Sequence, residues 1–133
     1  MAIAYLDSSC VVAIALGEAA SRPVIKALRK FDRLLSSNLL EAEVRAALER
    51  EAVRAHPDTL AGIDWILPDR SLTPEIDRVL AAGALRGADL WHIACALYVD
   101  PSAAELAFLT LDLKQQRVAA AAGFYTAGIT AVE

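Results

Sequence analysis

The chain lacks the features that mark membrane-spanning, secreted and disulfide-rich proteins. It has two cysteines among 133 residues, and neither has a close-spaced partner, so they make neither a disulfide framework nor a zinc site. No basic segment precedes the apolar N-terminal run, so we expect no secretory signal. The longest uncharged stretch, residues 118–132, contains two glycines and is shorter than the ~18 residues of a membrane-spanning helix. These absences predict a soluble, cytoplasmic chain with buried free thiols and no membrane partner.

Basic residues are also in deficit. The chain has 13 Lys and Arg against 17 Asp and Glu, a formal charge of −4. This balance argues against a broad basic surface that grips nucleic acid, but it leaves nucleic acid open as a substrate. The hydrophobic fraction is 56%, and 28 alanines raise it without implying membrane insertion. A chain of this length buries about two-thirds of its surface on folding, so we expect one domain over residues 1–133.

Short apolar runs alternate with helical patterns along the whole chain. The expected strands are residues 2–6, 33–36, 70–72, 106–111 and 124–129. The expected helices are residues 9–16, 22–31, 39–55, 58–67, 74–85, 89–99 and 113–122. Strands that alternate with helices predict an α/β domain with a mostly parallel sheet of four to five short strands.

Two acids stand where strands are expected to end. Asp7 follows the apolar run 2–6, and Asp112 follows the run 106–111. Sites in α/β sheets form at the carboxyl ends of the strands. Asp is also a good N-cap for the helix that follows, and for either acid alone we favour capping.

Glu43 is harder to explain as a surface residue. In the expected helix 39–55 its face is apolar, being made by Leu39, Leu40, Val44, Ala46 and Ala47. Glu41 faces the polar side, where it can pair with Arg45, and Arg45 can also pair with Glu49. Glu43 instead places a charge against the core, and buried carboxylates are retained when they are paired or bind a metal. We therefore favour a functional role for Glu43.

Asp89 opens the apolar helix expected at 89–99, where capping alone would explain it. Asp89 becomes significant as one of four acids in apolar segments, the others being Asp7, Glu43 and Asp112. If the sheet brings the four carboxylates together they repel one another, and bound divalent cations relieve that repulsion. Oxygen ligands favour Mg²⁺ or Mn²⁺ over zinc. Two such ions about 3.5–4 Å apart activate a water and stabilise the leaving oxygen of a phosphodiester, so metal-assisted phosphodiester hydrolysis is the predicted chemistry.

The segments around the four acids form an ordered set. They read LDSS (6–9), LEAEV (40–44), DLWHIA (89–94) and LTLD (109–112). In this order they resemble the four acidic motifs of PIN domains, and more narrowly those of VapC-type toxins of type II toxin–antitoxin pairs. The resemblance implies a three-layer α/β/α sandwich and an endoribonuclease that cuts single-stranded RNA with one or two Mg²⁺ or Mn²⁺ ions. It also implies a homodimer that a small VapB-like antitoxin inhibits.

Individual roles carry over from the family by motif. The catalytic and metal-binding acids become Asp7, Glu43, Asp89 and Asp112. Ser9 and Thr110 become supporting hydroxyls near the site, although Ser and Thr beside helix starts are commonly caps. Leu40 departs from the family, where Thr often precedes the helical acid, and this puts one polar contact in doubt.

Other residues near the acids can be explained by packing as well as by a functional role. His92 is one turn after Asp89, and a packed, hydrogen-bonded histidine explains it better than a metal ligand or base. Core or dimer packing explains Trp65 and Trp91 better than stacking on bases.

Three arginines are candidates for binding the substrate. Arg50 and Arg54 follow Glu43 on about the same helix face, where they could track an RNA backbone. Solvated charges and antitoxin contacts are the rival explanations. Arg86, three residues before Asp89, is a similar candidate.

A metal-dependent ribonuclease is the leading interpretation, and the main rival is a non-catalytic α/β interaction domain whose acids are helix caps. A phosphoacceptor receiver domain would need a paired acid beside the first strand and a Lys after a late strand. Asp7 is followed by two serines, and Lys114 lies only two residues after Asp112. A haloacid-dehalogenase-like phosphatase would need a second Asp where Ser9 stands. Both of these alternatives are weak.

Overall fold

A four-stranded sheet forms the middle of the computed structural model, which describes residues 1–129. Residues 130–133 of the expected domain lie outside this described part. The strands are β1 (Ile3–Leu6), β2 (Arg33–Ser37), β3 (Ile63–Ile66) and β4 (Leu106–Leu109). Their order across the sheet is β3-β2-β1-β4, and every neighbouring pair is parallel. The expected mostly parallel sheet of four to five strands is confirmed, with four.

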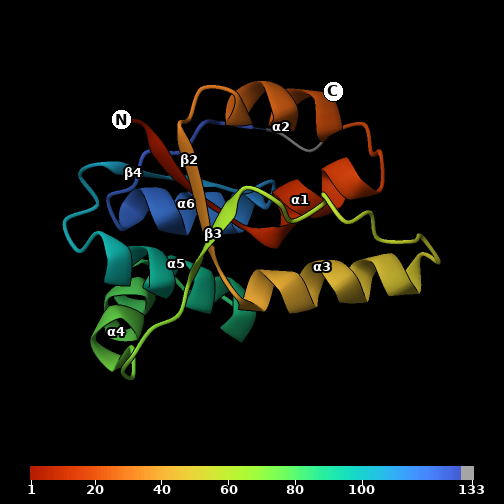
Figure 1. Ribbon diagram of the computed structural model, residues 1–133. Coiled ribbons are helices and arrows are strands. Elements are labelled where there is room, and N and C mark those ends of the chain that lie inside the picture. Colours follow the sequence, from red (N-terminus) through yellow and green to blue (C-terminus); the bar gives the residue numbers. More distant parts are fainter. Residues whose placement is uncertain (130–133) are drawn as a thin grey trace.

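Six helices cover the two faces of the sheet within residues 1–129 (Figure 1). They are α1 (Ser8–Ala15), α2 (Ser21–Leu28), α3 (Leu39–Arg50), α4 (Thr73–Ala82), α5 (Gly87–Val99) and α6 (Leu113–Ala121). None of the helices in this described part is long and apolar enough to cross a membrane.

Side chains that alternate along β1 and β4 divide the core into two layers. Tyr5 and Phe108 pack with α4, α5 and α6, and their rings stack with centroids 5.4 Å apart. Ala4, Leu6 and Leu109 pack on the opposite face with α1, α2 and α3. Successive residues of a strand point to opposite faces, so a strand that is buried on both faces carries a continuous apolar run. The result is the three-layer α/β/α sandwich.

Four sequence expectations about helices and strands are wrong. Residues 58–67 contain no helix, because the chain turns at Gly62 (φ 84°) and then forms β3. Residues 70–72 form no strand; Leu72 precedes α4 directly and is buried. Residues 124–129 form only an isolated bridge between Tyr125 and Ala107. The helix expected at 39–55 ends at Arg50, since Ala52 adopts the left-handed backbone region (φ 54°).

An ion pair fixes the segment that leads from β3 into α4. Arg70 donates to both carboxylate oxygens of the buried Glu75, at 3.0 Å and 2.6 Å, and its guanidinium lies 5.1 Å from the centre of the Tyr98 ring. The hydrogen bond from Arg70 lowers the pKa of Glu75 below its ordinary value of 4.5.

Glu75→Gln is therefore expected to melt at a lower temperature than the wild type at neutral pH. A carboxylate with a lowered folded-state pKa stabilises the fold above its unfolded value, and that stabilisation is lost as the pH falls through the folded value. The difference in Tm should shrink below about pH 4.5. Thermal melts across this range, with the exposed Glu105→Gln as a control, check it. A difference that stays the same in acid would contradict the ion-pair explanation.

Candidate functional site

The sheet topology brings two of the predicted acids to one edge. Asp7 follows β1 directly, and Asp112 lies three residues after β4. Because β1 and β4 are parallel neighbours with Leu6 opposite Leu109, both acids lie at the carboxyl edge of the sheet. The backbone N–H of Asp7 donates to the carbonyl of Leu109 at 2.9 Å, which ties this edge together.

All four predicted acids line one hollow at this edge, with a volume of about 570 Å³. Asp89 comes from the first turn of α5 and Glu43 from α3. Ser9 and Arg50 line the same hollow. We call it the acidic pocket. Its lining residues come from segments far apart in the sequence. Figure 1 shows that these segments, α1, α3 and α5, lie near one end of the sheet.

Asp7 is held rigidly. It is 4% exposed, and its Oδ2 accepts the backbone N–H of Ser9 at 3.0 Å. Its Oδ1 accepts the side-chain amide of Gln115 at 3.2 Å, and the Thr110 hydroxyl lies 3.4 Å from Oδ2. Asp7 therefore caps α1, as expected, and also faces the pocket.

Ser9 and Thr110 hold the loop that carries Asp112. The Ser9 hydroxyl accepts the N–H of Leu111 at 3.0 Å, and the Thr110 hydroxyl accepts the N–H of Asp112 at 3.1 Å. The two hydroxyl oxygens are 3.3 Å apart. Both residues thus lie beside the acids, and each accepts a hydrogen bond from a backbone N–H of the loop.

Gln115 links three of these elements, and the sequence analysis missed it. It is fully buried, accepts the Thr110 hydroxyl at 2.6 Å, and donates to Asp7 and to the backbone carbonyl of Asp89, each at 3.2 Å. It shares the buried face of α6 with Val118 and Ala119. A polar residue at that helical spacing is the signal that would have found it.

Capping explains Asp112 but not Asp89. Asp112 caps α6, because its Oδ1 accepts the N–H groups of Lys114 and Gln115 at 2.9 and 3.1 Å. The N-cap of α5 is Arg86, so Asp89 lies inside the first turn. Within residues 1–129, no hydrogen bond or ion pair involves its carboxylate. The suggestion that Asp89 is a cap is wrong.

The pocket is electrostatically unfavourable for Asp89. Burial raises the pKa of Asp89, and the charges of Asp7, Asp112 and Glu43 raise it further, against a smaller lowering by His92. The repulsion that the sequence predicted is therefore present, and it acts on Asp89, whose carboxylate accepts no hydrogen bond from residues 1–129.

Glu43 has a partner that the sequence analysis did not assign to it. Its Oε1 lies 2.6 Å from Nε2 of His92, which is fully buried and 4.0 Å from Oδ1 of Asp7. The expectation of a packed, hydrogen-bonded histidine is confirmed. The expected apolar face of α3 holds for Val44 but not for Ala46, which is exposed, so Glu43 lies at the margin of the core with its side chain 25% exposed.

The donor set fits a hard divalent cation. Four carboxylates line one pocket, and one of them accepts no hydrogen bond from the described residues. Oxygen ligands of this kind are those that Mg²⁺ and Mn²⁺ take. As the side chains stand, the described residues contain no group of three His, Cys, Asp or Glu close enough to hold an ion. The acids therefore share a pocket, and their side chains would have to close around the ion.

The candidate substrate-binding arginines lie in different places. Arg50 lines the acidic pocket, whereas Arg54 lines a separate hollow at the end of α3. Arg86 is exposed at the start of α5.

The two tryptophans also differ. Trp91 packs against the core and donates to the Ser37 hydroxyl at 3.1 Å, as expected of a packing residue. Trp65 is 38% exposed on the edge strand β3, so core packing does not explain it within the described chain.

In this α/β/α sandwich the acids lie at the carboxyl edge of a parallel sheet, which is where such folds place their sites. The family model of the PIN domain matches residues 4–121. The chain therefore belongs to the PIN domain family, whose members are generally metal-dependent nucleases. No curated protein and no solved structure matches the chain.

Proposed function

We propose that this PIN domain is a Mg²⁺-dependent endoribonuclease that acts as the toxin of a toxin–antitoxin pair. The observation that carries the nuclease assignment is the acidic pocket, where Asp7, Glu43, Asp89 and Asp112 converge from four elements. A fold that needed only helix caps has no reason to place Asp89 there, since it caps nothing and is repelled by the other three.

The four acids are the proposed ligands of one or two Mg²⁺ or Mn²⁺ ions. A divalent cation at such a site neutralises the phosphodiester and activates water for in-line attack. The acids differ in their hydrogen bonds: Asp7 accepts from Ser9 and Gln115, and Asp112 accepts the capping N–H groups of α6. Asp89 has no such restraint among residues 1–129. We assign Asp89 the movement that completes the site.

Water is the proposed nucleophile, because the described chain offers no activated side chain at the pocket. Burial raises the pKa of both Cys10 and Cys95 to about 12, so neither is a thiolate at neutral pH. The Ser9 hydroxyl accepts a backbone N–H and lies beside no base other than the acids themselves. Attack by water at phosphorus with the 3′-oxygen as the leaving group gives 5′-phosphate and 3′-hydroxyl ends, and no 2′,3′-cyclic phosphate forms.

Arg50 is the proposed contact for an RNA phosphate, because it lines the acidic pocket from the next turns of α3. Arg50→Ala is expected to raise KM and to flatten the log–log dependence of RNA binding on salt by about 0.7, the value for one single-strand phosphate contact. Arg54→Ala, whose side chain lines another hollow, should change both quantities less. Binding titrations at several salt concentrations check this. Equal effects of the two variants would remove Arg50 from the site.

The partners rest on the resemblance of the four motifs to VapC-type toxins. We propose a homodimer and a small VapB-like antitoxin that blocks the acidic pocket. The exposed Trp65 and Leu67 at the end of edge strand β3 support a further protein contact, since large apolar side chains there lack cover within the described chain. Light scattering on the purified chain tests the dimer.

The nuclease assignment is tested by incubating the full chain with single-stranded RNA of defined sequence, with Mg²⁺ or with EDTA. We expect internal cuts with Mg²⁺, none with EDTA, and 5′-phosphate ends by mass spectrometry. Cleavage that persists in EDTA, or products with 2′,3′-cyclic phosphates, would contradict the proposal. Complete absence of cutting across varied RNAs would favour the non-catalytic interaction domain.

A further inference from the structure

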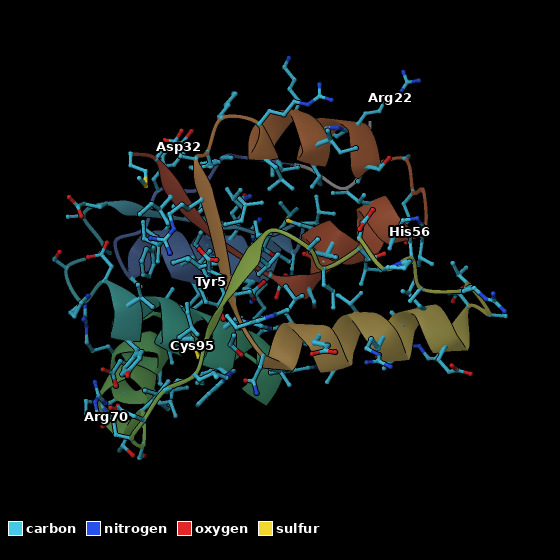
Figure 2. The ribbon with its side chains drawn as sticks, viewed as in Figure 1. Tyr5, Arg22, Asp32, His56, Arg70 and Cys95 are labelled. Carbon is cyan, nitrogen blue, oxygen red and sulfur yellow. The ribbon has the colours of Figure 1, made fainter. Side chains whose placement is uncertain are left out.

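A buried chain of hydrogen bonds runs beneath the acidic pocket. The backbone N–H of Ser37 donates to the Tyr5 hydroxyl at 3.1 Å, and this hydroxyl lies 2.7 Å from Nδ1 of His92. Nε2 of the same ring lies 2.6 Å from Oε1 of Glu43. Tyr5 and His92 are both fully buried, and Tyr5 lies at the centre of the molecule where the sheet meets α5 (Figure 2). These hydrogen bonds link β2, β1, α5 and α3.

The partners fix the direction of each bond. The Ser37 N–H can only donate, so Tyr5 accepts there and must place its own proton elsewhere. The Ser37 hydroxyl oxygen already accepts from the N–H of Leu39 at 3.0 Å and from the indole of Trp91 at 3.1 Å. A phenol keeps its proton at neutral pH, so the Tyr5 hydroxyl has one proton to donate. The Tyr5 hydroxyl therefore donates to Nδ1 of His92.

This direction determines the tautomer of His92. A neutral imidazole that accepts at Nδ1 carries its proton on Nε2. That N–H then donates to Glu43. The same nitrogen is 4.0 Å from Asp7, so one donor lies between acids that come from α3 and from the end of β1.

We infer that Tyr5 and His92 are positioning residues for the metal site: Tyr5 sets the Nε2–H tautomer of His92, and His92 holds Glu43 by Oε1, which leaves Oε2 for the cation. The inference rests on the proposed function of Glu43 as a ligand. Neither residue lines the pocket, so both act through Glu43. A partly exposed glutamate has several rotamers, and the hydrogen bond selects one before the ion arrives.

The first test reads the tautomer without metal or RNA. In the ¹⁵N-labelled full chain at mildly alkaline pH, long-range ¹H–¹⁵N spectra should show His92 with Nε2 protonated and Nδ1 bare. Tyr5→Phe keeps the ring that stacks on Phe108 and removes only the hydroxyl. We expect this variant to remain folded and to show a mixture of both tautomers. A wild-type His92 protonated on Nδ1 would overturn the inference and leave the nuclease proposal intact.

The second test measures Mn²⁺ binding by calorimetry with the metal alone. Loss of an outer partner of a ligand typically weakens metal binding by about 10–100-fold, and we expect Tyr5→Phe and His92→Asn at the lower end of that range. His92→Gln should lie closer to the wild type, because its amide N–H is as many bonds from Cα as Nε2. Tyr98→Phe is the matched control, since its hydroxyl donates to Asp69 at 2.9 Å, away from the pocket.

The outcomes separate the two proposals. Wild-type affinity in both Tyr5→Phe and His92→Asn, with both variants folded, would overturn the positioning role and leave the metal site standing. Equal weakening in Tyr98→Phe would show a general loss of stability and would also overturn it. A wild-type chain that binds no Mn²⁺ and cuts no RNA would overturn the proposed function, and the positioning role with it.

Discussion

Asp89→Asn is expected to reduce RNA cleavage by at least about 100-fold and to raise the Tm of the metal-free chain. A loss of about 100-fold is the upper end of what removing a ligand's outer partner produces. Cleavage falls because an amide is a poorer ligand for a hard cation and removes one charge from the acidic pocket. The Tm rises because Asp89 is repelled by Asp7, Asp112 and Glu43 and has no donor of its own among residues 1–129. A substitution that lowers activity and raises stability identifies a residue that is retained for function.

The pH dependence of that stabilisation follows from the raised pKa of Asp89. A raised folded-state pKa means that the charged form is disfavoured in the fold, so the penalty is complete above the folded value and disappears below the ordinary value of 3.8. The gain in Tm from Asp89→Asn should therefore be largest at neutral pH and shrink in acid. Thermal melts in EDTA check the stability, and RNA cleavage with Mg²⁺ checks the activity.

The control for Asp89 is Asp77→Asn, which changes the same side chain at an exposed position of α4. It should alter neither cleavage nor Tm appreciably. Undiminished cleavage by purified Asp89→Asn, with contaminating nuclease excluded, would remove Asp89 from the catalytic set. A lower Tm would show that its carboxylate makes a stabilising contact instead.

Glu43→Gln and Glu41→Gln form a matched pair, and only the first is expected to impair the enzyme. In Glu43→Gln the new amide carbonyl can still accept from His92, so the fold contact survives while the ligand charge is lost. We expect cleavage to fall by about 10–100-fold. Among residues 1–129, the Glu41 carboxylate pairs with Arg45 alone, at 3.1 Å and at an exposed position. Its loss should cost about 0.3–0.5 kcal/mol of stability.

The two variants should be compared by cleavage rate and by Mn²⁺ affinity in the same preparation. Equal losses at both positions would mean that the general charge of α3, and not the pocket, attracts the cation. Full activity in Glu43→Gln would remove Glu43 from the site and leave His92 as an ordinary buried histidine with a surface partner.

Much of the fold was predictable because its main elements carry strong local signals. The buried strands β1 and β4 read as continuous apolar runs that end near an acid. Residues 58–67 were wrongly predicted to form a helix because a short apolar run has no clear period. Part of this segment forms β3 by pairing with residues 34–37 of β2, which lie far back in the sequence. The end of the chain misled for a similar reason, since Tyr125 makes one bridge and no ladder.

The sequence predicted four acids that the structure brings into one pocket, but it did not predict their partners. Glu43 was identified because a carboxylate on an apolar helix face needs compensation, and its position at the margin of the core keeps that reasoning sound. That His92 supplies the contact depends on how α3 and α5 meet, which no local pattern encodes. The sequence suggested that Asp89 caps a helix beginning at residue 89, but the helix begins earlier, at Gly87, so Asp89 lies inside its first turn.

The most direct test of the acidic pocket as a metal site is an anomalous difference map from crystals of the full chain soaked in Mn²⁺. We predict a peak among Asp7, Glu43, Asp89 and Asp112 in the wild type, and a weakened or missing peak in Asp89→Asn. A chain that cleaves RNA with Mn²⁺ while its crystals show no peak in this pocket, or a peak elsewhere, would contradict the account.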